Sequence, residues 1–175
     1  MIKRKSASSL SARVTRTGAP IEPPVVTVLH VDDDPNDTEL LRAAARKAGV
    51  PFALHNAEDA DQAIAYLTGK GVYSDRETYQ IPALVLLDLK MPRATGFEVL
   101  KWIRQRSKLA QIPVVVLSGS ELQDDIQEAY KVGANSYMVK PLGFDALVQL
   151  VRNINTAWIA ALPRPGQGVE LSAGL

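Results

Sequence analysis

The chain of 175 residues carries a formal net charge of +1, is 46% hydrophobic and contains no cysteine. This length and composition predict one domain with a substantial hydrophobic core. The near-neutral charge gives no strong field for nucleic acid or an anionic membrane, and no apolar run is long enough to span a bilayer. The lack of cysteine excludes disulfides, thiolate metal sites and cysteine nucleophiles, and it suits the reducing cytoplasm, where we expect the protein.

The two ends of the sequence are expected to lie outside the folded domain. Residues 1–24 are basic and Ser-rich with few large apolar side chains, which predicts a disordered tail. An organellar presequence and a nucleic-acid-binding arm are the alternative interpretations of this segment. Residues 163–175 are rich in Gly and Pro and predict a flexible tail, so the domain is expected to span residues 25–162.

Five apolar runs alternate with five helical patterns along this expected domain. Apolar and β-branched runs predict strands at 25–31, 52–55, 83–87, 113–117 and 136–139. Apolar residues at helical spacing predict helices at 37–48, 57–67, 97–106, 122–132 and 144–162. Asn56 is expected to cap the second helix, and Gly49 and Gly133 are expected to end the first and the fourth. The alternation predicts an α/β domain whose doubly wound, parallel five-stranded sheet carries helices on both faces.

Acidic, hydroxyl and amino side chains follow the predicted strands at the point where each strand ends. Asp32, Asp33 and Asp34 follow the first strand, Asp88 the third, Ser118 the fourth and Lys140 the fifth. We expect these side chains to meet at one edge of the sheet, because sites in open parallel sheets form beyond the carboxyl ends of the strands. Carboxylates gathered there repel one another unless a hard cation such as Mg²⁺ lies among them. A carboxylate beside that metal can act as a nucleophile toward phosphorus, while Lys140 and Ser118 bind phosphoryl oxygens.

The motifs VDDDP, LLDLKMP, VVVLSGS and SYMVKP follow the first, third, fourth and fifth predicted strands. With these motifs in this order, the sequence resembles the response-regulator receiver family over residues 25–162. The resemblance implies a flavodoxin-like fold with strand order 2-1-3-4-5 and a cis bond before Pro141. It also implies a role for each site residue: Asp88 as phosphoacceptor, Asp32, Asp33, Asp88 and the Lys90 carbonyl as Mg²⁺ ligands, Lys140 as the phosphate-pairing lysine, and Ser118 and Tyr137 as switch residues.

A narrower similarity links the chain to single-domain regulators that serve phytochrome-type histidine kinases. It is carried by segments such as PFALHNAEDADQAIAYL and by the long loop GKGVYSDRETYQI at 69–81. The similarity implies a histidine kinase as phosphodonor. We expect signalling by altered protein contacts, and the near-neutral charge predicts no nucleic-acid or membrane partner. The chain departs from these regulators at Asp34, which adds a carboxylate, at Lys90, where a smaller or apolar residue is frequent, and at Ser118, which replaces a usual threonine.

The fifth predicted helix carries an apolar stripe that spans about half of its circumference. Covering one face of a sheet requires a somewhat narrower stripe. The excess at Leu150 and Ile159 predicts contact with a second copy of the chain, and the family resemblance points to dimers formed by the fourth helix, fifth strand and fifth helix. Packing of this excess against residues 163–175 is the alternative.

Several of these residues also have a purely structural interpretation. Asp34 precedes Pro35 and is expected to be a helix N-cap rather than a metal ligand. Tyr137 is either a switch or a half-buried packing residue. His30 lies within an apolar strand and is expected in or near the core, and neither His30 nor His55 stands in the helical hairpin that a phosphodonor histidine requires.

Three rival functions are each at odds with particular residues. A magnesium-dependent phosphatase with an aspartyl nucleophile normally has an acid two residues further on, where this chain has Lys90. An FMN-binding protein needs a Ser/Thr/Gly-rich phosphate loop where the triplet at 32–34 stands. A degenerate receiver that serves only as an interaction module does not need the intact set of site residues. We therefore expect a phosphoacceptor that catalyses its own phosphotransfer and dephosphorylation, not an enzyme with a separate substrate.

Overall fold

The computed structural model describes residues 26–50, 52–92 and 95–160 of the chain. The tails predicted at 1–24 and 163–175 lie outside these residues, as do residues 161–162 at the end of the expected fifth helix. Within the described ranges, no helix is both long enough and apolar enough to cross a membrane.

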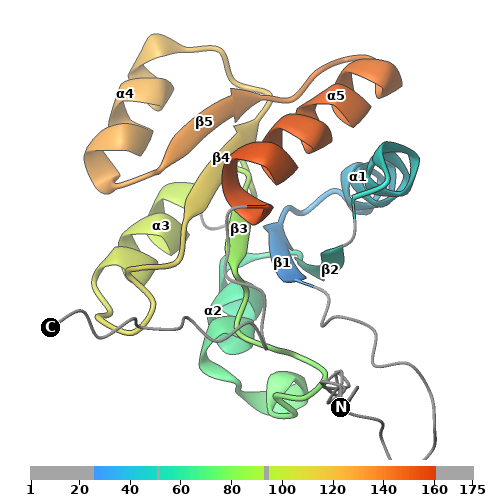
Figure 1. Cartoon of the computed structure of the whole chain (residues 1–175). Coiled ribbons are helices and arrows are strands. Elements are labelled where there is room, and N and C mark those ends of the chain that lie inside the picture. Colours follow the sequence, from blue (N-terminus) through green and yellow to red (C-terminus); the bar gives the residue numbers. More distant parts are fainter. Residues whose placement is uncertain (1–25, 51, 93–94, 161–175) are drawn as a thin grey trace, which may run out of the picture.

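A parallel five-stranded sheet forms the centre of the domain, in the order β2-β1-β3-β4-β5 (Figure 1). The strands are β1 (Val26–Val31), β2 (Phe52–Ala57), β3 (Leu84–Leu87), β4 (Val114–Ser118) and β5 (Ser136–Val139). The side chains of β1, β3 and β4 are almost all buried, because helices cover both faces of the sheet. The doubly wound fold and the flavodoxin-like strand order expected from the sequence are confirmed.

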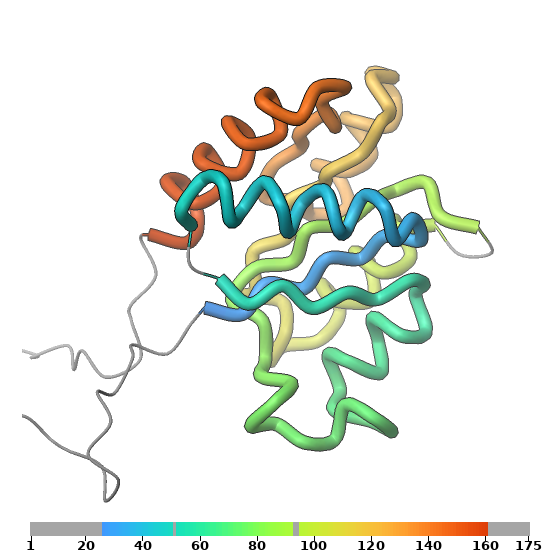
Figure 2. Tube along the Cα trace, turned by 90° about the vertical axis from the view of Figure 1, so that its right-hand side faces the viewer, coloured from blue at the N-terminus to red at the C-terminus, as the bar shows by residue number. Residues whose placement is uncertain are grey.

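Two helices cover one face of the sheet and three cover the other. The helices are α1 (Pro35–Ala48), α2 (Ala60–Thr68), α3 (Gly96–Arg104), α4 (Gln123–Val132) and α5 (Phe144–Ile154). In the turned view of Figure 2, α1 and α5 lie side by side, with α2 on the opposite side of the sheet. Alternation along β1 divides the core: Val28 packs with Leu41 and Val148 of α1 and α5, whereas Leu29 belongs to the cluster that includes Tyr66 of α2.

The first helix begins where the acidic triplet ends. Asp34 Oδ1 accepts a hydrogen bond from the backbone N–H of Asn36 at 2.8 Å, and Pro35 stands in the first turn, where its missing N–H costs nothing. The N-cap interpretation of Asp34 is thus confirmed. At the other end, Gly49 adopts the left-handed conformation with φ of 68° and ends the helix as predicted.

The predicted start of the second helix is wrong. Asn56 and Ala57 extend β2, because they pair in register with His30 and Val31 of β1. Asp59 takes the capping role expected of Asn56, since its side chain accepts a hydrogen bond from the backbone N–H of Gln62 at 2.8 Å.

The continuous fifth helix expected over 144–162 is also wrong. α5 ends at Ile154, and the chain continues in one π-helical turn, Asn155–Ile159. Ile159 is only 6% exposed, Leu150 is half-buried, and both pack with the core cluster between α1, α5 and the sheet. Packing within the domain therefore accounts for the wide apolar stripe, and these two residues do not indicate a second copy.

The long loop predicted at 69–81 contains one short 3-10 turn, Gly71–Tyr73. Three tyrosines and His55 pack together beside this loop, with ring centroids 5.1 to 5.9 Å apart (Tyr66, Tyr73 and Tyr79). His55 is therefore part of an aromatic cluster, which agrees with the expectation that it is not a phosphodonor.

Candidate functional site

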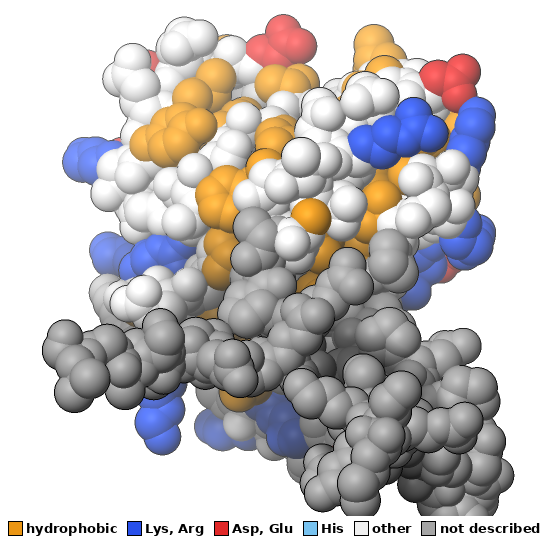
Figure 3. Space-filling model, in the orientation of Figure 1, with side chains coloured by type: hydrophobic (Ala, Val, Ile, Leu, Met, Phe, Trp, Pro, Cys, Tyr) orange, Lys and Arg blue, Asp and Glu red, His pale blue; other side chains and the backbone are white. Residues whose placement is uncertain are grey.

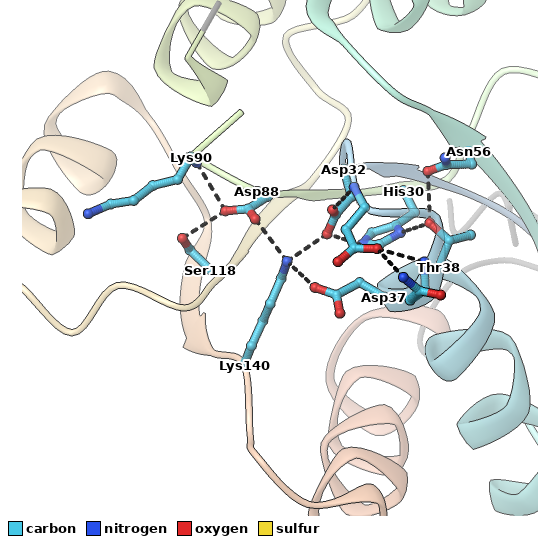
Figure 4. A network of polar contacts seen from close by, with 11 residues as sticks. His30, Asp32, Asp37, Thr38, Asn56, Asp88, Lys90, Ser118 and Lys140 are labelled. Carbon is cyan, nitrogen blue, oxygen red and sulfur yellow. Dashed lines mark hydrogen bonds and ion pairs between the residues drawn. The ribbon is translucent and has the colours of Figure 1, made fainter. Parts of the chain in front are cut away.

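Asp88, Ser118 and Lys140 meet at the carboxyl edge of the sheet (Figure 4). Ser118 Oγ donates a hydrogen bond to Asp88 Oδ1 at 2.8 Å, and Lys140 Nζ donates to Asp88 Oδ2 at 2.8 Å. The backbone N–H of Lys90 adds a bond to Asp88 Oδ1 at 3.1 Å. The chain segments at the ends of β3, β4 and β5 thus hold the Asp88 carboxylate by both of its oxygens, as the strand-end pattern predicted.

Asp32 is the buried member of the acidic triplet, with 1% of its surface exposed. Its Oδ2 accepts a hydrogen bond from Lys140 Nζ at 2.7 Å, and its Oδ1 accepts one from the backbone N–H of Asp34 at 2.9 Å. His30 Nε2 lies 3.3 Å from Asp32 Oδ2 but does not have the geometry of a hydrogen bond. Burial alone would raise the pKa of Asp32, yet His30 and Lys140 lower this pKa to about 2. Asp32 is therefore ionised at neutral pH.

The Lys140 ammonium contacts three carboxylates at once. Besides Asp32 and Asp88, it donates a hydrogen bond to Asp37 Oδ2 at 2.7 Å. Burial would lower the pKa of Lys140, but the hydrogen bonds to these carboxylates outweigh burial and raise the pKa above its ordinary value. Lys140 therefore stays charged and is held between β1, β3 and α1.

Asp33 and Asp34 have different surroundings although they are adjacent. Asp33 is half-buried, and its side chain forms no hydrogen bond or ion pair with any described residue. Asp34 is exposed, and its carboxylate caps α1. Of the three consecutive aspartates, Asp33 is therefore the one whose oxygens are both available to a ligand.

The oxygen donors at this edge fit a hard divalent cation. Among the described residues, no three His, Cys, Asp or Glu side chains are grouped closely enough to form a metal site by themselves. The Lys140 ammonium lies between Asp32 and Asp88, so these carboxylates already bind a positive charge. Carboxylate and carbonyl oxygens with retained water are the ligands that Mg²⁺ prefers. Asp32, Asp33, Asp88 and the Lys90 carbonyl as metal ligands stay a prediction.

Tyr137, the expected switch residue, belongs to a neighbouring network. Its ring is half-buried against a small apolar cluster, and its hydroxyl donates a hydrogen bond to the Ser120 carbonyl at 2.8 Å. Burial raises the pKa of Tyr137. Ser120 Oγ bonds to the Asp125 carboxylate, which lies 3.3 Å from Lys90 Nζ. Lys90 and Ser120, each two residues beyond a site residue, are thus linked through Asp125.

His30, Asp37 and Asp125 contact these groups but were not predicted as site residues. His30 stands two residues before Asp32 in a strand, so both side chains point to the same face, and this signal was present in the sequence. Asp37 and Asp125 lie in the first turns of α1 and α4. Their positions depend on where each helix begins relative to the sheet, which the alternation of strands and helices does not specify.

The Lys140–Pro141 peptide bond is trans, as are all the peptide bonds of the described residues. The cis bond implied by the family resemblance is therefore wrong for this chain. Trans is the intrinsically favoured form of an X–Pro bond. The residue before the proline, Lys140, continues the β4–β5 ladder, because its backbone N–H donates a hydrogen bond to the Ser118 carbonyl at 2.9 Å.

Gly96 begins α3 directly against the backbone of Asp88. A Cβ atom at position 96 would lie 2.1 Å from the Asp88 carbonyl oxygen, so Gly96→Ala must displace α3 or the end of β3. Such overpacking costs about 1–3 kcal/mol, and we expect the midpoint of thermal unfolding to fall by about 5 °C. Gly119→Ala is the control, since nothing lies within 4 Å of a Cβ at that position. Equal midpoints for the two variants would contradict this role of Gly96.

The family model of the response regulator receiver domain matches residues 28–152. The chain therefore belongs to the response regulator receiver family, the class to which its fold and strand-end groups pointed. Within this family it is similar to phytochrome response regulators. Response regulator Rcp1 of Synechocystis sp. is 34% identical over 143 residues, which cover 82% of this chain and 95% of Rcp1.

Two solved structures extend this similarity. The phosphorylated cyanobacterial phytochrome response regulator RcpA has a TM-score of 0.72 and 34% identity, over 81% of this chain and 99% of RcpA. The Mn²⁺-bound form of response regulator Rcp1 has a TM-score of 0.69 and 32% identity, over 80% of this chain and 99% of that structure. The chain is thus a receiver-domain response regulator homologous to Rcp1, and the resemblance seen in its motifs is confirmed.

Proposed function

We propose that Asp88 accepts a phosphoryl group from the phosphohistidine of a sensor histidine kinase. In this proposal Asp88 has the role of the acceptor aspartate of the family. The observation that carries this proposal is the Asp88 carboxylate, 7% exposed and hydrogen-bonded by both Ser118 and Lys140. One Asp88 oxygen forms a bond to phosphorus while the bond from phosphorus to the histidine nitrogen breaks. The nitrogen keeps the electron pair and then takes up a proton.

Lys140 and Ser118 would stabilise the transferred group without moving far. The Lys140 ammonium can pair with one phosphoryl oxygen and the Ser118 hydroxyl can donate to another, since both side chains already contact Asp88. Bound Mg²⁺ supplies further charge neutralisation, and Asp32, Asp33, Asp88 and the Lys90 carbonyl would hold it. The similarity to Rcp1, which has been solved in an Mn²⁺-bound form, supports a divalent cation as a ligand of this chain.

The same groups would serve both formation and hydrolysis of the aspartyl phosphate. The domain would thus catalyse its own phosphorylation and dephosphorylation, with no separate substrate to turn over. A phosphatase with an aspartyl nucleophile is disfavoured, because Lys90 stands where its general acid is needed and the Lys90 ammonium faces Asp125 at 3.3 Å. A module that only binds partners would have no use for a lysine held among three carboxylates.

Incubation with acetyl phosphate and Mg²⁺ tests this proposal. We expect each chain to gain one phosphoryl group, located on Asp88 by peptide mass spectrometry, and to gain none when a chelator removes the metal. A phosphoryl group found on a different residue would contradict the proposal.

We further propose that Ser118 and Tyr137 transmit the signal. Ser118 is fully buried and bonded to Asp88, and the loop that follows it carries the Ser120 carbonyl to which the Tyr137 hydroxyl binds. A phosphoryl group on Asp88 would draw the Ser118 hydroxyl toward itself and move this loop. The Tyr137 contact would then change, as a shift between two packings of the same surface.

The surface beside Tyr137 is a suitable site for a homodimer, which we propose as the assembled state. Hydrophobic side chains gather over β5 and the adjoining parts of α4 and α5 (Figure 3). Four exposed apolar residues define this α4–β5–α5 patch: Tyr130, Val139, Leu142 and Phe144. A C2 pair would bring the same patch of two chains face to face.

Leu142→Asp is expected to convert this dimer into a monomer. Leu142 is fully exposed, and losing its burial at an interface while adding a charge weakens association by at least about tenfold. Sedimentation at micromolar concentration measures the effect, with Leu40→Asp as control, because Leu40 is 48% exposed on α1, outside the patch. A wild-type chain that stays monomeric with and without a phosphoryl mimic would contradict the dimer.

We place the protein in the cytoplasm, with proteins as its partners. Histidine kinases form phosphohistidine from ATP, so their acceptors are expected in the compartment that supplies it. The formal net charge of +1 supports neither nucleic acid nor an anionic membrane as a further partner.

A further inference from the structure

Among the described ion-pair partners of Lys140, Asp37 is the one that lies outside the strand ends. Lys140 Nζ lies 2.7 Å from Asp32 Oδ2, 2.7 Å from Asp37 Oδ2 and 2.8 Å from Asp88 Oδ2. Asp32 and Asp88 follow β1 and β3, whereas Asp37 projects from the first turn of α1 (Figure 4). Two of these carboxylates thus belong to the proposed phosphorylation site, and the third approaches Lys140 from a helix.

The three contacts use the whole hydrogen-bonding capacity of the lysine. An ammonium group has three N–H donors and no acceptor, so each carboxylate takes one donor. A phosphoryl group on Asp88 must take over one of these donors, and a divalent cation beside Asp32 competes for another. Neither phosphorylation of Asp88 nor cation binding beside Asp32 removes the contact between Lys140 and Asp37.

The local structure holds Asp37 in place. The preceding turn is fixed by the Asp34 cap, and the following residue, Thr38, bonds through its hydroxyl to both His30 and Asn56. Lys140, in contrast, carries its charge on a flexible four-carbon stem. A carboxylate on a fixed helix end can therefore determine where the lysine ammonium lies.

The pair is also partly shielded from water. Lys140 is 20% exposed and Asp37 37% exposed. Both line a small cavity of about 60 Å³ whose other walls include Leu40, Leu117 and Leu147. An ion pair in such apolar surroundings is stronger than one on an open surface.

We propose that Asp37 is a positioning residue, which holds the Lys140 ammonium at the strand edge so that it pairs with the phosphoryl group on Asp88. This inference rests on the proposed function of Asp88 and adds to it a residue that touches neither the phosphoryl group nor the metal. When a cation binds Asp32, Lys140 loses that carboxylate as a partner. Without Asp37, Lys140 would then have no fixed partner besides Asp88 and its phosphoryl group.

The first test measures phosphorylation by acetyl phosphate at saturating Mg²⁺, together with the Mg²⁺ affinity of the unphosphorylated chain. Asp37→Asn should slow phosphorylation by about tenfold, the loss of about 1.4 kcal/mol of stabilisation, and change the Mg²⁺ affinity by less than about threefold. Asp37→Glu should recover part of the rate. Asp145→Asn is the matched control, because Asp145 stands in the first turn of α5 and pairs with Lys47 at 2.7 Å, away from the site.

The second test measures thermal unfolding of the metal-free chain and does not depend on phosphorylation. Asp37→Asn should lower the unfolding midpoint when Lys140 is present. In the Lys140→Met background it should raise the midpoint, because the change then removes a carboxylate that only repels Asp32 and Asp88. This reversal of sign is the signature of a residue that acts through Lys140.

Each outcome separates this inference from the proposed function. A wild-type chain that takes up no phosphoryl group would contradict the function, and the unfolding measurement would still decide the Asp37–Lys140 pair. An Asp37→Asn chain that is phosphorylated at the wild-type rate would overturn the inference alone. The inference would also be overturned if Asp37→Asn weakened Mg²⁺ binding as much as the substitution Asp33→Asn does, because Asp37 would then be a metal ligand. An equal change of the unfolding midpoint in the wild-type and Lys140→Met backgrounds would overturn it as well.

Discussion

Asp33→Asn is expected to weaken Mg²⁺ binding by about ten- to hundredfold. Asp33 has no partner among the described side chains, so its carboxylate is available to a cation, and it directly follows Asp32 beyond the end of β1. Losing one charged ligand removes an interaction of about 1.5–3 kcal/mol, which corresponds to this range of affinity. Calorimetric titration of the unphosphorylated chain with Mg²⁺ measures it directly.

Asp34→Asn is the matched control for this experiment. Asp34 is the next residue along the chain, but its carboxylate caps α1 through the backbone N–H of Asn36, a role that asparagine fills equally well. We expect a change in Mg²⁺ affinity of less than about threefold, from the lost charge alone. Equal losses for the two variants would show that the assignment of ligand and cap within the triplet is wrong.

Lys140→Met is expected to destabilise the metal-free chain by about 3 kcal/mol. Removing the ammonium leaves Asp32, Asp37 and Asp88 close together without the cation that they share. Breaking a largely buried ion pair by deleting one partner has a cost of this size, because a buried charge is left uncompensated. Chemical denaturation without metal measures the loss.

Mg²⁺ should return more stability to the Lys140→Met chain than to the wild type, because the divalent cation then replaces the missing ammonium. Lys47→Met serves as control, since Lys47 pairs with the exposed Asp145 at 2.7 Å and its loss should change stability little. Similar effects of the two lysine substitutions would contradict the account of the Lys140 contacts.

The strand-end residues could be predicted because parallel topology leaves little freedom. Once Asp88, Ser118 and Lys140 were assigned to the ends of successive parallel strands, the sheet had to bring them to one edge. The structure places them within hydrogen-bonding distance of one another. The cap at Asp34 was likewise predictable, because a capping aspartate followed by proline is a local pattern that depends on no distant residue.

The other features of the fold and the site depend on tertiary contacts that the sequence pattern does not specify. Asn56 looks like a helix cap, but pairing with β1 keeps it in a strand, so the tertiary contact overrides the local preference. In a continuous helix, Ile159 would widen the apolar stripe beyond the part that the sheet covers. The π-helical turn Asn155–Ile159 instead places its side chain in the core. Asp37 reaches Lys140 because α1 begins at Pro35, shortly after the end of β1, and this start depends on helix placement and not on periodicity.

The measurement that tests the central claim most directly is phosphorylation of wild-type and Asp88→Asn chains by acetyl phosphate with Mg²⁺, followed by intact mass spectrometry. Asparagine keeps the size of the side chain but cannot form the acyl phosphate, so we expect one phosphoryl group on the wild type and none on Asp88→Asn. Asp125→Asn, which changes a nearby carboxylate outside the proposed acceptor position, should still be phosphorylated. Undiminished phosphorylation of Asp88→Asn would contradict the assignment of Asp88 as the acceptor.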